Sequence, residues 1–437
     1  MLSGKKRFGQ ILLCLFASIL LSCTALAEGE SLTDYAAQLR LNKASETVKA
    51  EVTVKTFVDG DTTHFNVPTE VVPSGVLRAR YLAVNTPEIT GKVEEYGKRA
   101  AAFTKEKLSS ATSIIIESDD GKWNLDSTGG RHLVFVWYLP EGETEYRCLN
   151  LELLQNGLAL ANSTANNRYG STCMAALNQA KAQKLNLYSG QKDPDFYYGA
   201  AIEMTLRELR TNVEAYNGKK VAFSGIVTLN SNQSVFVEAF DAETGLYFGI
   251  PVYYGYGMSG AGLDILSVGN EVRIVGTLQY YEAGGTWQVS GLTYRMMKPD
   301  DPGNIQKLSG GHSAAYAKVD PGTFAHGTVS IESTGGARIF PWAQLALGTS
   351  VSMDGLTVQQ VHSNEEQGSS SYGAMTLTCA SDTATVTIRT QPLYENGTLI
   401  TKERYEGKTL SVRGIVDVYD GAYQIRVLSP EHITIEP

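Results

Sequence analysis

Three short polar clusters in the first half of the chain combine residue types that could act together on a phosphate ester. The first is Asp59-Gly60-Asp61-Thr62, the second runs from Arg80 to Asn85-Thr86-Pro87-Glu88, and the third is Gly130-Arg131. Cleavage of a phosphate ester by water requires positive charge on the phosphate and a base that activates the water. The clusters contain oxygen ligands, a carboxylate and arginines of the kinds that this chemistry uses.

Each residue type has a place in that chemistry. Calcium prefers carboxylate, amide and backbone carbonyl oxygens, which Asp61, Asn85 and the Thr86 backbone could supply. Glu88 is the candidate general base. Arg80 and Arg131 are candidate phosphate ligands, because a guanidinium can donate two parallel hydrogen bonds to phosphate oxygens and an ammonium cannot.

Taken singly, each cluster also has a purely structural interpretation. Asp-Gly-Asp is typical of a β-turn. Thr86-Pro87-Glu88 is typical of a helix start, with a capping threonine, a proline in the first turn and a glutamate near the positive end of the helix dipole. Arg131 after two glycines fits a solvated side chain at the mouth of a hairpin. The chemical interpretation therefore depends on whether the fold brings the clusters together.

Short strands and helices alternate around these clusters. Apolar alternation predicts strands at 51–57, 77–84, 113–117 and 132–139. Helical spacing predicts helices at 94–108, 150–156 and 170–187, and Gly157 is suited to a helix C-cap. About five short strands with a few helices favour a small closed barrel of the oligonucleotide/oligosaccharide-binding (OB) type, which we place at residues 50–190.

The rear half of the chain is richer in strands. After a predicted helix at 205–216, strand patterns follow at 220–228, 234–240, 271–279 and 286–294. The segment GNEVRIVG at 269–276 matches GKTLSVRG at 407–414, and WQV at 287–289 corresponds to YQI at 423–425, which indicates duplicated modules. We therefore expect two further OB-like barrels, at 200–298 and 336–437, joined by a linker at 299–335 that is rich in Gly, Ser, Pro and Asp. The expected fold class is β-rich α+β.

Composition limits the function classes. The 437 residues carry a net charge of −9, and residues 51–190 are close to charge balance. Proteins that coat nucleic acid carry a basic excess, because neutralisation of the phosphates supplies most of their affinity. A coating protein is therefore not expected, whereas an enzyme that releases its products tolerates this charge.

The N-terminus has the pattern of an export signal. Lys5, Lys6 and Arg7 precede an apolar run and the small-residue site Ala25-Leu26-Ala27, which predicts removal of a signal peptide at 1–27. A lipoprotein signal acylated on Cys23 is the second interpretation. Both predict a secreted, extracellular protein, either released or lipid-anchored, and no later stretch is long and apolar enough for a transmembrane helix.

Cysteine usage is compatible with export and does not indicate a disulfide scaffold. Beyond the signal the chain contains Cys148, Cys173 and Cys379, so at most one bridge can form. A Cys148–Cys173 bridge and a pair of buried free thiols are both open. No cysteine–histidine spacing indicates zinc.

The polar clusters resemble, in their order, those of the thermonuclease (staphylococcal nuclease) family. Members have a D-G-D-T turn, an arginine-bearing strand that leads to D-T-P-E, a helix containing Y-G-x-x-A-x-x-F-T-K, and a later G-R before a strand. The corresponding segments here are 59–62, 80–88, 96–105 and 130–131. The resemblance covers about residues 50–190, and ordered matches are more specific than any single motif.

The resemblance implies a calcium-dependent endonuclease that hydrolyses DNA and RNA. Water attack with the 5′ oxygen as leaving group would give 3′-phosphate products. Asp59 would orient the ligands from the outer shell. The implied catalytic residues are Arg80, Glu88 and Arg131, and the implied Ca²⁺ ligands are Asp61, Asn85 and Thr86.

The chain departs from the family pattern at two places. Asn85 replaces the usual aspartate of D-T-P-E, and because calcium affinity follows ligand charge we expect weaker metal binding. The lysine and tyrosine that precede the final Gly-Arg in the prototype are replaced by Ser127 and Thr128. Since those positions contact a terminal phosphate in the prototype, nucleotide affinity and product preference are expected to differ.

The rear modules carry no comparable cluster. Their tyrosines and Trp287 could stack on single-stranded bases or could fill barrel cores, and barrels of this type also bind sugars and proteins. The alternatives to a nuclease are a non-catalytic nucleic-acid-binding module and a polysaccharide-binding surface protein. Joint presence of Arg80, Glu88 and Arg131 favours the enzyme, which we expect to be a monomer.

Overall fold

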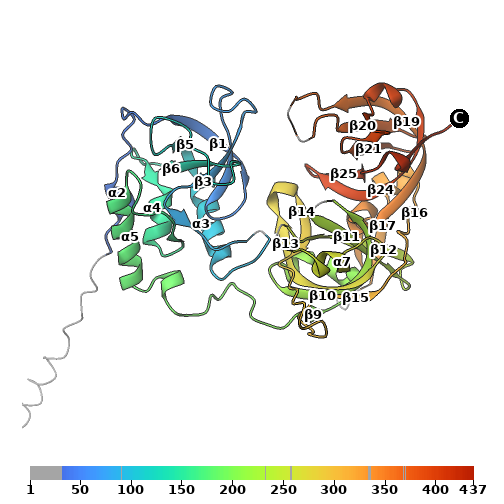
Figure 1. The fold of residues 1–437 in the computed structure, drawn as a ribbon, viewed down its shortest axis with the longest axis horizontal. Helices are drawn as coiled ribbons and strands as arrows, with labels where there is room; N and C mark the ends of the chain where they lie inside the picture. The colour runs from blue at the N-terminus through green and yellow to red at the C-terminus, as the bar shows by residue number, and fades with distance from the viewer. Residues whose placement is uncertain are drawn as a thin grey trace, which may run out of the picture.

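The computed structural model describes residues 32–437 except positions 90, 232, 256–257, 333–335, 368 and 370. Within these residues three β-barrels follow one another along the chain, each built on a hydrophobic core. In Figure 1 the first barrel lies on one side of the molecule, and the second and third lie together on the other side. The predicted export signal, with both of its interpretations, lies outside the described residues.

The first barrel has the strand connections of an OB-type fold. Its strands are β1 (Lys49–Phe57), β2 (Thr62–Asn66), β3 (Val76–Tyr81), β5 (Ala111–Glu117) and β6 (His132–Pro140). β1 pairs with β2 and β5, β2 with β3, and β5 with β6, all antiparallel. β3 and β6 run parallel and close the barrel around Phe65, Leu77, Phe135 and Trp137.

Helices and short strands surround this barrel. They are α2 (Tyr35–Gln38), β4 (Val84–Asn85), α3 (Gly97–Ser109), β7 (Arg147–Cys148), α4 (Leu149–Gln155), β8 (Leu160–Ala161), α5 (Gly170–Ala182) and η1 (Asn186–Tyr188). α4 is followed by Gly157, whose φ of +64° fits the predicted C-cap. α3 begins later than the helical spacing predicts, because Tyr96 adopts a left-handed conformation with φ 64°.

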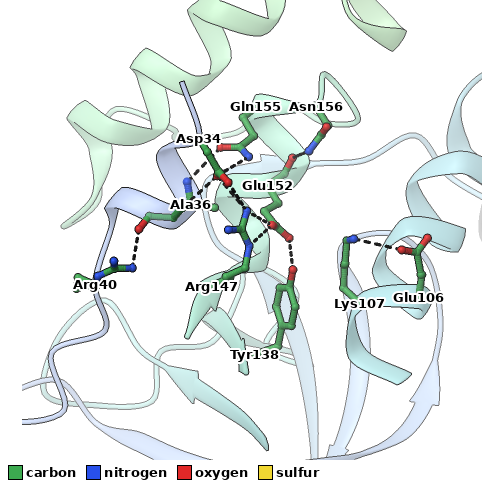
Figure 2. A network of polar contacts seen from close by, with 11 residues as sticks. Asp34, Ala36, Arg40, Glu106, Lys107, Tyr138, Arg147, Glu152, Gln155 and Asn156 are labelled. Atoms are coloured by element: carbon green, nitrogen blue, oxygen red, sulfur yellow. Dashed lines mark hydrogen bonds and ion pairs between the residues drawn. The ribbon is translucent and has the colours of Figure 1, made fainter. Parts of the chain in front are cut away.

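A polar network ties the segment before β1 to this barrel. Asp34 caps α2 by accepting the Ala37 N–H at 3.0 Å, and its carboxylate also accepts from the Arg147 guanidinium at 2.8 Å. Arg147 donates through Nε to Glu152 on α4 at 2.6 Å, and the Tyr138 hydroxyl donates to the other oxygen of Glu152 at 2.7 Å. Figure 2 shows these side chains meeting between α2, α4 and the sheet. The segment before β1 is therefore part of the first barrel's fold.

The second barrel repeats the connections of the first. Its strands are β10 (Lys220–Asn230), β11 (Ser234–Asp241), β12 (Leu246–Tyr253), β13 (Glu271–Tyr281) and β14 (Thr286–Ser290), with β9 (Ile202–Glu203) and β15 (Gln306–Ser309) at the edges. β10 pairs with β11 and β13, β11 with β12, and β13 with β14. A parallel contact between β12 and β14 closes the barrel.

The third barrel has the same topology again. Its strands are β19 (Ser350–Ser363), β20 (Met375–Ala380), β21 (Thr385–Thr390), β24 (Thr409–Tyr419) and β25 (Ala422–Val427), with β16 (Ala317–Lys318) and β26 (Ile433–Ile435) at the edges. β19 pairs with β20 and β24, β20 with β21, and β24 with β25, while β21 and β25 run parallel. The OB-type fold class predicted for all three parts is therefore confirmed.

The internal repeat predicted from the sequence corresponds to this shared topology. Its two glycine-bounded segments lie on β13 and β24, and the following WQV and YQI segments lie on the neighbouring strands β14 and β25. A Cβ at Gly276 would lie 2.7 Å from the Ser290 carbonyl oxygen, and one at Gly414 would lie 2.6 Å from that of Arg426. Glycine is needed at both positions because the adjacent strand passes too close for a side chain.

Helices and strands form within the described part of the stretch predicted as a linker at 299–335. β15 from this stretch pairs with β13 of the second barrel, and β16 pairs with β19 of the third barrel. The predicted helix at 205–216 is divided in two, and its first half starts in a capping box of Thr205 and Glu208. The remaining elements of the rear half are α6 (Leu206–Thr211), η2 (Val213–Tyr216), α7 (Ala261–Ile265), η3 (Glu282–Gly284), α8 (Pro321–His326), β17 (Thr328–Ile331), β18 (Arg338–Pro341), α9 (Trp342–Leu345), β22 (Tyr394–Glu395), β23 (Thr398–Leu399), η4 (Lys402–Arg404) and η5 (Pro430–His432).

A buried glutamate joins the second barrel to the third. Oε1 of Glu238 on β11 accepts the Ala315 N–H at 2.9 Å and the Ser350 hydroxyl at 2.8 Å, and its Oε2 accepts the Ser350 N–H at 2.7 Å. Elsewhere in the described chain, Cys148, Cys173 and Cys379 are free and buried, so the free-thiol interpretation holds. No helix within the described ranges is long and apolar enough to cross a membrane.

Candidate active site

The loop between β1 and β2 carries Asp59 and Asp61 and is held in place by α3. A Cβ at Gly60 would meet the Ala100 Cβ and the Thr86 side chain at 2.9 Å, so the loop packs too tightly there for any other residue. Thr104 on α3 donates its hydroxyl to the Gly60 carbonyl at 2.6 Å. Both aspartates are buried as a result.

Asp61 links this loop to the end of β4. Its Oδ2 accepts the backbone N–H of Thr86 at 2.7 Å. Its Oδ1 accepts the Thr62 hydroxyl at 3.1 Å and forms an ion pair with Arg80. Two of the three sequence clusters therefore meet at one carboxylate.

Arg80 reaches Asp61 from β3. It lies opposite Thr62 in the pairing of β2 with β3, and beside Leu133 of β6. Its guanidinium also donates to the Asn85 amide oxygen at 2.5 Å. Burial lowers the pKa of Arg80 from its usual value, and the negative charge of Asp59 opposes that shift. Because arginine titrates far above neutral pH, the group stays charged and provides a fixed cation.

Glu88 and Asp59 lie close enough to influence each other. Burial raises the pKa of Asp59 although Arg80 acts in the opposite direction. Desolvation, followed by the charge of Asp59, raises the pKa of Glu88 to about 7. The Glu88 residue as a whole is nevertheless exposed, so its carboxyl group lies at the rim of the site with access to water. A carboxyl group with these properties is suited to accept a proton near neutral pH.

Arg131 enters the site from the start of β6. Its Nε donates to Asp126 at 2.7 Å, and its side chain is 37% exposed. Burial tends to raise the pKa of Asp126, but hydrogen bonds from Thr128 and Arg131 lower it to about 2. The Asp126 carboxylate is therefore charged and accepts from the Nε of the guanidinium. The two terminal nitrogens of this partly exposed group remain to contact a phosphate.

The oxygen atoms predicted to hold calcium are of suitable kinds. The carboxylate of Asp61 and the amide oxygen of Asn85 both face the Arg80 guanidinium, which shows that they converge on one positive group. The Thr86 hydroxyl is buried without a hydrogen-bond partner among the described residues. No group of three or more His, Cys, Asp and Glu that could hold a metal occurs in the described ranges. Calcium accepts amide and carbonyl oxygens, so these donors fit such a cation, which would compete with Arg80 for them.

Contacts and electrostatic interactions connect all the sequence-predicted site residues. Asp61, Arg80, Asn85 and Thr86 are in direct contact. Glu88 and Arg131 each influence the pKa of Asp59 and the pKa of Arg80, so both lie near these two residues. Sequence reasoning included Thr104 in the helix motif at 96–105 without assigning it a role, and it missed Asp126. The feature of the sequence that could have indicated Asp126 is its position five residues before Arg131, with Gly129 and Gly130 allowing the loop to turn back between them.

A protein-family model matches part of the first barrel. Residues 78–190 match the family model described as Staphylococcal nuclease homologue (SNase). The matched region begins in β3 and includes Arg80, Glu88 and Arg131. β1, β2 and the loop with Asp59 and Asp61 precede it and complete the same barrel. This part of the chain is therefore similar to the staphylococcal nuclease family.

Proposed function

We propose that this chain is an exported, calcium-dependent nuclease that hydrolyses the phosphodiester bonds of DNA and RNA. The observation that carries the proposal is the grouping of Arg80, Arg131 and Glu88 around two buried aspartates. The SNase match supports a nuclease-type activity. A barrel that only bound nucleic acid would use the arginines but would have no use for a carboxylate beside them, because that carboxylate repels phosphate.

Glu88 is the proposed general base, and the two arginines are the proposed phosphate ligands. The Glu88 carboxylate takes a proton from a water molecule while the water oxygen bonds to phosphorus. The bond from phosphorus to the 5′ oxygen breaks, that oxygen leaves and takes up a proton from solvent water, Glu88 releases its proton to solvent, and the product retains a 3′ phosphate. Arg80 from β3 and Arg131 from β6 stabilise the negative charge that develops on the phosphate oxygens.

Asp61, Asn85 and the Thr86 backbone carbonyl are the proposed calcium ligands, and Asp59 orients them from outside. When bound, calcium supplies Lewis-acid polarisation of the phosphate. Asn85 contributes an oxygen but no charge. We therefore expect calcium to bind more weakly than it would to a site with a second carboxylate.

Export is the part of the proposal that rests on sequence alone. The basic start, the apolar run and the Ala25-Leu26-Ala27 site support secretion after removal of residues 1–27. Acylation of Cys23 would instead leave the mature protein anchored to the cell surface. The enzymatic proposal is independent of which of the two occurs.

The proposed function is tested by digestion of single-stranded DNA and RNA with the purified mature protein. We expect cleavage with millimolar calcium, no cleavage with a chelator, and a decrease of about 10²–10⁴-fold in kcat for Glu88→Gln, the range for loss of a general base. Glu106→Gln, an exposed change on α3, is the matched control and should retain full activity. A folded wild-type protein that binds nucleic acid but cleaves none at high calcium would instead support the non-catalytic binding module.

A further inference from the structure

A cleft lies between the first and second barrels, directly beside the proposed active site. Its volume is about 360 Å³. The end of β1 and α3 form one wall, and the β13–β14 hairpin forms the other. In Figure 1, β13 and β14 lie on the side of the second barrel that faces the first barrel. Asp59 of the active site and Ile89, which follows Glu88, both line the cleft, so it is continuous with the site.

Two contacts hold the second barrel against the first at this cleft. Lys105 on α3 forms an ion pair with Glu282 on η3, at the tip of the hairpin. Gln279 on β13 donates its side-chain amide to the Ile89 carbonyl. The second wall is thus attached to the chain segment that carries Glu88.

The side chains that line the cleft include an exposed aromatic ring, the two lysines Lys98 and Lys105, and the carboxylates of Asp59 and Glu282. Tyr280 is 45% exposed, and its ring packs against Trp287 with the centroids 5.2 Å apart and the planes tilted by 59°. This packing restricts the Tyr280 ring while leaving part of it accessible. Lys98 and Lys105 lie two helical turns apart on the same face of α3. Lys98 contacts the Asn217 carbonyl at 3.4 Å and forms no ion pair among the described residues.

We propose that this cleft binds a nucleotide adjacent to the scissile phosphate of a single-stranded substrate, with its base stacked on Tyr280 and its phosphate at Lys98. The inference rests on the proposed nuclease function. Stacking of bases on aromatic side chains, together with basic residues that contact the backbone, is the usual mode of single-strand binding, and here Tyr280 and Lys98 supply these two contacts. The volume falls near the lower end of the range of about 300–1,000 Å³ for ligand pockets, so the cleft has room for one unstacked nucleotide and excludes a duplex. The second barrel is then part of the substrate site and selects single strands.

The test compares Tyr280→Ala with Tyr394→Ala in the full mature protein. Tyr394 is a matched control because it is 54% exposed and lies on the third barrel, away from the cleft. Two substrates are used: a long single-stranded oligonucleotide, and a nitrophenyl diester of one nucleotide that occupies only the catalytic site. We expect Tyr280→Ala to raise KM for the oligonucleotide by about tenfold, the scale of one lost stacking contact, without changing kcat/KM for the small diester. Equal KM values for the two variants, or an equal loss on both substrates, would overturn the proposal.

A binding measurement separates failure of this inference from failure of the nuclease proposal. Fluorescence anisotropy of a labelled single-stranded oligonucleotide without calcium reports binding even when no cleavage occurs. Weaker binding by about tenfold in Tyr280→Ala, with Tyr394→Ala unchanged, would support the cleft whether or not the protein is a nuclease. Equal affinities would overturn it. If Tyr280→Ala melts below the wild type, Tyr280→Leu replaces it, because leucine keeps the apolar bulk and removes the aromatic face.

Discussion

At the scale of single residues, Asn85 sets the charge of the proposed calcium site. Asp61 is the one carboxylate among the three proposed ligands, and Arg80 shares it. Asn85→Asp would add a second negative charge, so we expect the calcium concentration for half-maximal activity to decrease by about tenfold. Calorimetric titration with calcium provides a readout that does not depend on activity.

The opposite result for Asn85→Asp would exclude position 85 as a calcium ligand. If the new carboxylate only strengthened the pairing with Arg80, calcium affinity would be unchanged or lower, and position 85 would not be a ligand. Asn85→Ala is the control, because it removes the oxygen and should weaken calcium binding relative to the wild type. The two substitutions should therefore shift the calcium titration in opposite directions.

The residues proposed to act on substrate were identified from the sequence, whereas the roles of the residues that support them became visible only in the structure. Asp61, Arg80 and Glu88 lie in short motifs whose order along the chain is itself informative. Thr104 belongs to the helix motif at 96–105, but nothing in that motif indicates a role for its hydroxyl, and Asp126 lies outside any motif of this kind. Their roles depend on what the folded chain brings to them, namely the Gly60 carbonyl and Arg131.

At the scale of elements, α3 serves to fix the β1–β2 loop. Thr104→Val keeps the shape of the side chain but leaves the Gly60 carbonyl without its hydrogen bond in a buried position. We expect a loss of about 1–3 kcal/mol in the free energy of unfolding, together with lower activity because Asp59 and Asp61 are held less firmly. Urea denaturation and single-strand cleavage measure the two effects.

Thr104→Ser is the matched variant for this element. It keeps the hydroxyl and loses only a methyl group, so most of the stability and activity should return. If Val and Ser variants had the same activity, the hydrogen bond from α3 would not position the loop. The result would then assign Thr104 to packing alone.

Two strands that complete the barrels have sequences that only weakly favour strand formation. β2 is a short segment of mostly polar residues, and β12 contains Gly249 and Pro251, which disfavour strands. Both form because strands on each side pair with them, β1 and β3 for β2, and β11 and β14 for β12. Strand formation at these positions is therefore decided by tertiary pairing rather than by local preference.

At the scale of the whole molecule, three barrels could be predicted, but their mutual arrangement could not. The repeat between β13 and β24 leaves a pattern in the sequence, because closely spaced strands need the same apolar alternation and the same glycine. The cleft beside Asp59 depends on Tyr280, which lies in a different barrel. Nothing in the residues around Asp59 or Tyr280 indicates the other, since their proximity results from the packing of two separately folded parts.

The junction of the rear barrels depends on Glu238. Its carboxylate is the acceptor in all three of its hydrogen bonds. Glu238→Gln would place an NH₂ group against the N–H of Ser350 or of Ala315, so one buried donor would lose its acceptor. We expect a decrease of about 1–3 kcal/mol in the free energy of unfolding of the rear barrels. Urea denaturation followed by fluorescence measures it.

The exposed Glu243 on the same barrel provides the control variant for Glu238→Gln. Glu243→Gln removes an exposed ion pair with Arg207 and should cost only about 0–1 kcal/mol. Cleavage of the small diester should be unchanged in both variants, because the first barrel contains the whole proposed catalytic site. Equal stability of the two variants would mean that Glu238 does not hold the rear barrels together. A decrease confined to Glu238→Gln would show that this buried carboxylate stabilises the junction between the two rear barrels.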